Sequence, residues 1–87
     1  MITKELIVKN RAGIHARPAS AIVKTAARFK SEIFFEKEDM VINAKSIMGI
    51  ITLGATFRTK ITCKCEGPDE VDMIHAMEDL FENRFEL

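Results

Sequence analysis

One histidine and one arginine, two positions apart, are the side chains of this sequence best suited to phosphate chemistry. His15 and Arg17 lie in the segment GIHARPA, residues 13–19, where Pro18 is typical of the first turn of a helix. That turn has N–H groups without partners and a partial positive charge, so it attracts anions. An imidazole placed there could accept a phosphoryl group reversibly, beside a guanidinium that fits phosphate oxygens.

Each of the two residues also has a simpler interpretation. A single histidine is most often a polar surface residue, and Arg17 could be a solvated residue of the first turn. A cation at that end of a helix is disfavoured by the helix dipole unless an anion is present. The pair therefore favours an anion site over two unrelated surface residues.

The rest of the sequence offers His15 no catalytic partner, since no general base or second nucleophile accompanies it. The other histidine, His75, lies within helical reach of Asp72 and Asp79, and we expect it to form a surface ion pair. A nucleophile without such partners is typical of a carrier that receives and passes on a group. No cofactor is expected.

The two cysteines are separated by one lysine, so on a strand both would point to the same face. We expect Cys63 and Cys65 to be reduced and buried. A zinc site would need about four ligands, and we predict no metal site.

Composition is that of a single globular domain spanning residues 1–87, with 47% hydrophobic and 30% charged residues. No apolar run approaches the length of a bilayer span and no signal peptide is evident, so a cytoplasmic location is expected.

Charge is distributed unevenly along the chain. Residues 1–65 carry 12 basic and 5 acidic side chains, whereas residues 66–87 carry 1 basic and 8 acidic side chains. Without a basic stripe bearing aromatic residues, nucleic acid is not expected as a partner, whereas an acidic protein surface is.

Hydrophobic periodicity predicts strands at residues 2–9, 32–37, 40–44 and 60–66, and helices at 16–29, 47–53 and 70–83. Ser46 is the expected N-cap of the short helix and Gly54 its end, while Asp69 is expected to cap the last helix. The order β-α-β-β-α-β-α predicts a two-layer α+β domain with helices on one face of a sheet. The other face would expose the apolar side chains of Ile7, Phe34 and Val41. We expect these to be scattered surface residues, and the alternative is a partner or dimer surface.

Two motifs make the chain similar to a known family. Residues 13–19 and residues 43–50, NAKSIMGI, resemble the histidine-containing phosphocarrier family HPr of the bacterial phosphoenolpyruvate:sugar phosphotransferase system, in register across nearly all 87 residues. The resemblance implies an open-faced β-sandwich, with four antiparallel strands and three helices on one side. It also implies that His15 is phosphorylated at Nδ1 by phospho-enzyme I and passes the group to sugar-specific IIA domains.

The resemblance assigns further roles. Arg17 and the backbone amides of Ala16 and Arg17 would stabilise the phosphoryl group, and Ser46 would match the serine that HPr kinase/phosphorylase modifies in many bacteria. A phosphate on Ser46 would add negative charge to a basic docking face. A transcriptional regulator is a further possible partner, and the protein is expected to be a monomer. The candidate partner contacts are Ser20, Lys24, Lys45, Ile47, Met48 and Ile51.

The sequence departs from the family pattern in places. Ile14 replaces the usual leucine, Ser20 stands where alanine is common, and residues 56–59 lack the glycine often found before the last strand. Residues 79–85 resemble a nitrogen-regulatory branch, whereas residues 45–49 resemble a serine-regulated one. The alternative to sugar transport is therefore a regulatory interaction module. It would be either nitrogen-regulatory, or dependent on Ser46 phosphorylation with His15 idle, as in relatives that lack the histidine. A third alternative is an α+β domain with an unrelated binding role.

Overall fold

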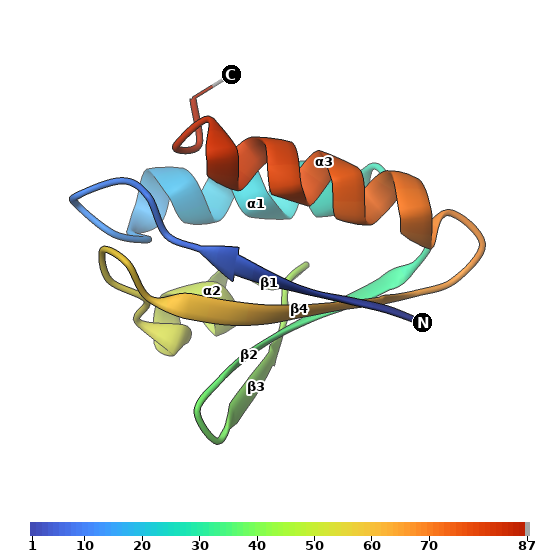
Figure 1. Ribbon diagram of the computed structural model, residues 1–87, viewed down its shortest axis with the longest axis horizontal. Helices are drawn as coiled ribbons and strands as arrows, with labels where there is room; N and C mark the ends of the chain where they lie inside the picture. Colours follow the sequence, from blue (N-terminus) through green and yellow to red (C-terminus); the bar gives the residue numbers. More distant parts are fainter. Residues whose placement is uncertain (87) are drawn as a thin grey trace.

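The computed structural model describes residues 1–86 and arranges four strands and three helices in the order predicted from the sequence. The strands are β1 (Ile2–Ile7), β2 (Glu32–Lys37), β3 (Met40–Asn43) and β4 (Lys60–Glu66). The helices are α1 (Ala16–Ala27), α2 (Ile47–Leu53) and α3 (Glu70–Glu82). The strands form one antiparallel sheet in the order β1-β4-β2-β3, and α1 and α3 lie side by side over it (Figure 1). The predicted open-faced α+β sandwich is confirmed.

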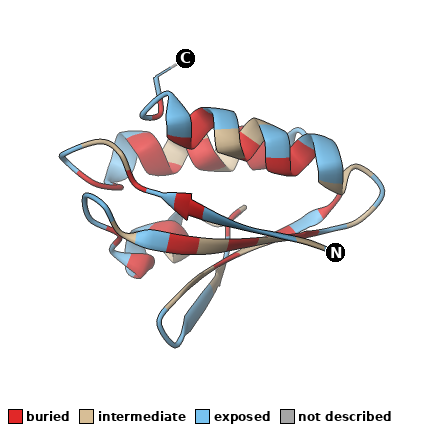
Figure 2. Ribbon diagram, in the orientation of Figure 1, coloured by how far each residue is buried: buried red, intermediate tan, exposed pale blue. Residues whose placement is uncertain are grey.

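The core lies between the helices and one face of the sheet, because alternate residues of each strand point to that face. On β4 these are Ile61, Cys63 and Cys65, all fully buried. Phe35 of β2 meets Phe81 of α3 edge to face, with ring centroids 5.8 Å apart. Burying a large apolar side chain stabilises the fold by about 1.5–3 kcal/mol. Figure 2 shows the buried residues between the two layers.

The prediction of reduced, buried cysteines is also confirmed. Cys63 and Cys65 are both free, and their Sγ atoms are 4.0 Å apart. The hydrogen bond to Cys65 and burial together raise the pKa of Cys63 above its ordinary value. The same hydrogen bond lowers the pKa of Cys65. Both side chains are fully buried, so the pair is packed in the core away from solvent. No helix within residues 1–86 has the length and apolar character needed to span a membrane.

The uncovered face of the sheet carries the apolar residues expected there. Ile7 and Val41 are exposed, at 38% and 58%, whereas Phe34 is half-buried. Phe34 is paired across the strands with Lys64, whose Nζ lies 2.8 Å from a carboxylate oxygen of Glu36. Phe34 and Val41 line one hollow of this face together with Met1, and charged side chains such as Lys64 and Glu36 border it, so these apolar side chains are grouped rather than scattered.

Four of the seven elements end one or two residues earlier than predicted. After Ala27, Arg28 and Phe29 donate to the carbonyls of Thr25 and Ala26, which tightens the chain out of the α-helix. The first strand ends at Ile7, the third at Asn43, and the last helix at Glu82. Helix and strand ends are where local periodicity carries least information.

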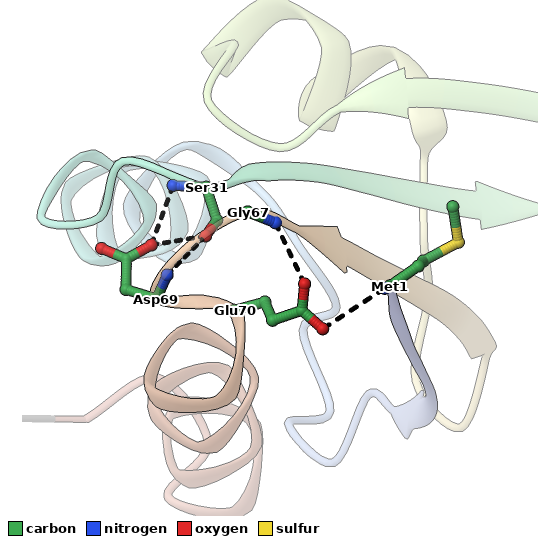
Figure 3. Close-up of polar contacts among 5 residues, drawn as sticks. All are labelled: Met1, Ser31, Gly67, Asp69 and Glu70. Atoms are coloured by element: carbon green, nitrogen blue, oxygen red, sulfur yellow. Dashed lines mark hydrogen bonds and ion pairs between the residues drawn. The ribbon is translucent and has the colours of Figure 1, made fainter.

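Asp69 occupies the N-cap position of α3, but its side chain does not cap that helix. Its carboxylate accepts hydrogen bonds from the backbone N–H groups of Lys30 and Ser31, both at 2.9 Å, and from the Ser31 hydroxyl (Figure 3). The predicted capping role is therefore wrong. Asp69 instead fastens the α1–β2 connection to the start of α3. Beside it, Glu70 accepts from the Gly67 N–H and pairs with the N-terminal amine of Met1.

We expect Asp69→Asn to reduce thermal stability at neutral pH. Hydrogen bonds from Ser31 and Lys30 lower the pKa of Asp69 to about 2. A carboxyl with a depressed folded pKa stabilises the fold above its unfolded pKa, and this contribution is lost as the pH falls through the folded pKa. The gap in Tm between variant and parent should therefore close from about pH 4 to about pH 2.

Circular dichroism melts over that pH range test this expectation, with Asp72→Asn, an exposed carboxylate on the same helix, as the matched control. An identical pH dependence for the two variants would contradict the role assigned to Asp69.

Candidate functional site

His15 stands at the N-cap of α1 with its side chain exposed to solvent. Its backbone is extended, at φ −109 and ψ −161, and its imidazole makes no capping hydrogen bond. Most N-cap side chains accept a hydrogen bond from a backbone N–H of the first turn, and so occupy one of its donors. Here the ring is left available for chemistry, and the donors of the turn are left available for a ligand.

The first turn of α1 offers two such donors. Pro18 has no N–H, and the N–H of Ala19 donates to the His15 carbonyl at 2.9 Å. Within residues 1–86, the N–H groups of Ala16 and Arg17 have no acceptor. The turn also contains no acidic residue. The sequence expectation of an anion-attracting helix start is thus matched by the backbone.

A close contact between two loops fixes the approach to His15. Gly13 has φ +75, and a Cβ there would lie 2.9 Å from the carbonyl oxygen of Ala55 and 3.1 Å from the Cα of Thr56. The next residue, Ile14, is buried and donates its N–H to the Ala55 carbonyl at 2.9 Å. Glycine is required because it alone accepts both the conformation and the contact. Asn10 closes the loop by donating to the Gly13 carbonyl at 2.6 Å.

Arg17 shares one side of α1 with two of the predicted partner residues. Arg17, Ser20 and Lys24 line a hollow of about 470 Å³, together with Phe85 and Glu86 beyond α3. Arg17 and Lys24 are exposed, and no carboxylate lies within ion-pair distance of either in residues 1–86. Their charges are therefore free to meet an anionic group or an acidic partner.

Helix α2 presents the predicted serine and an apolar patch. The Ser46 hydroxyl caps the helix by accepting from the Gly49 N–H at 3.1 Å, and Gly54 ends it at φ 63, as predicted. Beside the cap, Ile47, Met48 and Ile51 are 41%, 67% and 43% exposed. These three side chains form the α2 patch, which is available for a partner.

Lys45, predicted to be a partner contact, is held by a hydrogen bond within the protein. Its Nζ donates to the Phe29 carbonyl at 2.9 Å, and the residue is half-buried. It therefore fastens the start of α2 to the end of α1, through a hydrogen bond over 16 positions that no local pattern indicates.

His75 is exposed on α3, and the expected ion pair with Asp72 or Asp79 is not formed. No cluster of three metal-ligating side chains occurs within the described residues.

Gly13→Ala should destabilise the protein more than Gly54→Ala. Both glycines have positive φ, but a Cβ at position 13 would lie 2.9 and 3.1 Å from backbone atoms, whereas at position 54 the nearest atom, the Thr52 carbonyl oxygen, lies at an ordinary contact distance of 3.8 Å. A residue forced into this region costs about 1–3 kcal/mol, and each kcal/mol lowers Tm by about 4–8 °C in a domain of this size. Thermal melts of the two variants measure the difference, and equal losses would contradict the loop contact.

Ser46→Ala should reduce the free energy of unfolding by about 1 kcal/mol, because the cap of α2 is lost. Ser46→Asp should retain most of it, since a carboxylate also caps. Urea unfolding measures both. Ser20→Ala on α1 serves as the control, and a loss there as large as at position 46 would argue against the cap.

Known proteins resemble this chain over most of its length. The family model described as "PTS HPr component phosphorylation site" matches residues 2–83. The phosphocarrier protein HPr of Treponema pallidum is 46% identical over 86 residues, covering 99% of this chain and 98% of that protein. The HPr-like protein Crh of Halalkalibacterium halodurans is 44% identical over 77 residues, covering 88% and 92%. The crystal structure of HPr-C-His from Thermoanaerobacter tengcongensis superposes with a TM-score of 0.94 at 44% identity, covering both chains fully.

These matches span nearly the whole chain and agree with the fold and with the exposed histidine at the start of α1. The chain belongs to the HPr family of phosphocarrier proteins.

Proposed function

We propose that this protein accepts a phosphoryl group on His15 from phospho-enzyme I in the cytoplasm and passes it, as a monomer, to sugar-specific IIA domains. The observation that carries the proposal is an exposed imidazole at a helix N-terminus whose first turn has two free N–H donors and Arg17 beside it. Membership of the HPr family supports the choice of partners.

The chemistry needs few groups. The lone pair of a neutral imidazole nitrogen attacks phosphorus, a P–N bond forms, and the bond from phosphorus to the donor's leaving atom breaks. No general base is required, because the attacking nitrogen carries no proton. The amides of Ala16 and Arg17 and the Arg17 guanidinium stabilise the phosphoryl oxygens. In the second step a nucleophile of the IIA domain attacks phosphorus and the imidazole leaves.

Docking would use both helices next to His15. The cations Arg17 and Lys24, with Ser20 between them, suit an acidic surface, and the α2 patch supplies the apolar contact that interface centres require. Lys45 adds positive charge there but is held by Phe29. One surface of this composition can serve enzyme I and the IIA domains in turn.

Phosphorylation of Ser46 by an HPr kinase/phosphorylase would regulate this docking. Ser46 precedes the α2 patch directly, so a phosphate would place about two negative charges beside it. An acidic partner would be repelled, while a transcriptional regulator with basic residues could gain affinity. A purely regulatory role with His15 idle is the second candidate, favoured by the similarity to the HPr-like protein Crh.

His15→Ala should abolish labelling of the protein by radioactive phosphoenolpyruvate and enzyme I, whereas His75→Ala should be labelled like the parent. His75 is the matched control for His15. Both side chains are exposed, but only His15 stands at a helix start with free donors. Retained labelling of His15→Ala would exclude the proposed transfer. Failure of the parent to be labelled would favour the regulatory role.

Arg17→Ala should slow transfer by about 10- to 100-fold, since a charge-assisted hydrogen bond contributes about 1.5–3 kcal/mol. Its side chain is exposed, so Tm should stay within about 2 °C of the parent. A quenched time course of phosphate labelling measures the transfer rate, and thermal melts measure Tm. A loss of Tm with no loss of rate would place Arg17 outside the site.

A further inference from the structure

A second hollow lies at the same end of the molecule but away from the α1 surface. It has a volume of about 430 Å³ and is formed by the end of β1, the loop before β4 and the turn after α3. In Figure 1 the loop before β4 lies on the left and the turn after α3 lies above it, near the C-terminus. All polar residues that line the hollow are cationic. We use the name basic hollow for these residues together with Phe57, namely Lys9, Phe57, Arg58, Lys60 and Arg84.

The charges of the basic hollow are largely uncompensated. Lys9 pairs with Glu82 at 2.7 Å, but both side chains are well exposed, and such pairs contribute little. No carboxylate within residues 1–86 lies at ion-pair distance from Arg58, Lys60 or Arg84. Like charges around one concavity repel each other, and a bound anion removes that repulsion.

An exposed aromatic ring is part of the same cluster. Phe57 is 40% exposed, and the guanidinium carbons of Arg58 and Arg11 lie 5.3 and 6.0 Å from its ring centroid. Arg11 thereby adds another cation at the rim. Ile7, 38% exposed, lines the hollow as well and adds apolar surface beside the ring.

Two arginines of the hollow have left-handed backbone conformations that glycine would adopt without strain. Arg58 has φ 69 and Arg84 has φ 54. Such a conformation costs about 1–2 kcal/mol for a residue with a Cβ. Arg58 is held by its N–H bond to the Val8 carbonyl at 2.7 Å, and the turn at Arg84 by Phe85, whose N–H bonds to Leu80. The chain thus has a guanidinium at both positions where glycine would be the less strained residue.

We propose that the basic hollow is a binding site for a small organic molecule with two phosphate groups, such as a nucleoside diphosphate or a sugar bisphosphate. Guanidinium forks fit phosphate oxygens in pairs, and several cations around one hollow match two phosphates better than one. The volume falls within the range of about 300–1,000 Å³ typical of small-molecule sites. Phe57 and Ile7 provide the surface for the organic part.

The proposal is tested by NMR titration of the full-length protein with ADP and with inorganic pyrophosphate at constant ionic strength. Saturable shifts are expected in the amides of residues 7–9, 57–60 and 84, with a Kd below about 1 mM. The variant His15→Ala should bind ADP as tightly as the parent, because His15 does not line the hollow.

Arg58→Gly and Arg84→Gly should each weaken binding of ADP at least tenfold while leaving Tm unchanged or raising it, because the left-handed strain is relieved. Glu38→Gly is the matched control. Glu38 also has a positive φ, 55, but lies at the β2–β3 turn outside the hollow, so its replacement should not alter binding.

Three outcomes would overturn the proposal. These are the absence of saturable shifts, binding of sulfate as tight as that of pyrophosphate, and tighter binding of a polyglutamate peptide than of ADP at the same amides. The last two would identify the hollow as a general anion-attracting surface or a protein-docking surface.

Discussion

The contact between Gly13 and the backbone of Ala55 and Thr56 is the constraint on which the functional end of this protein depends. It joins two loops that are 42 positions apart in the chain, measured from Gly13 to Ala55. On one side, the Ile14–Ala55 hydrogen bond sets the position from which His15 begins α1. On the other, the same loop continues into Phe57 and Arg58 of the basic hollow. One packing contact between backbones therefore positions both candidate sites.

The remainder of the fold provides a rigid base for that contact. A sheet covered on one face buries Phe35 and the alternate residues of β4, and α1 and α3 close the core above them. Long-range polar bonds then hold the connections, with Asp69 fastening the α1–β2 link and Lys45 fastening α2 to α1. Flexibility in these links would move Arg17 and the α2 patch relative to each other, and the proposed docking uses both at once.

Local features of the sequence were sufficient for much of this architecture. The periodicity of each segment predicts all seven elements, because burial on one face imposes a repeat that can be counted. Ser46 and Gly54 are correctly predicted since a cap acts within about four residues. His15 and Arg17 were selected by the same local reasoning, because a helix start can be recognised from the sequence, and their role is the proposal made above.

What local patterns could not predict are contacts between distant segments. Asp69 satisfies the rules for a cap, but the donors of Lys30 and Ser31, brought close by the fold, compete for its carboxylate. His75 has carboxylates at helical spacing, yet no ion pair forms, because exposed pairs gain little over hydration. The basic hollow combines residues from three segments that only tertiary structure brings together. The missing glycine in residues 56–59 was the one visible sign of it.

Pro18 has a further consequence for a carrier of this design. Pro18 removes one donor from the first turn, which leaves the N–H groups of Ala16 and Arg17 as its free donors within the described residues. In the proposed transfer, oxygens of the arriving phosphoryl group would replace water at these donors. Because a helix start supplies its donors without a lid, the rate of the proposed relay would depend on how quickly partners arrive and depart.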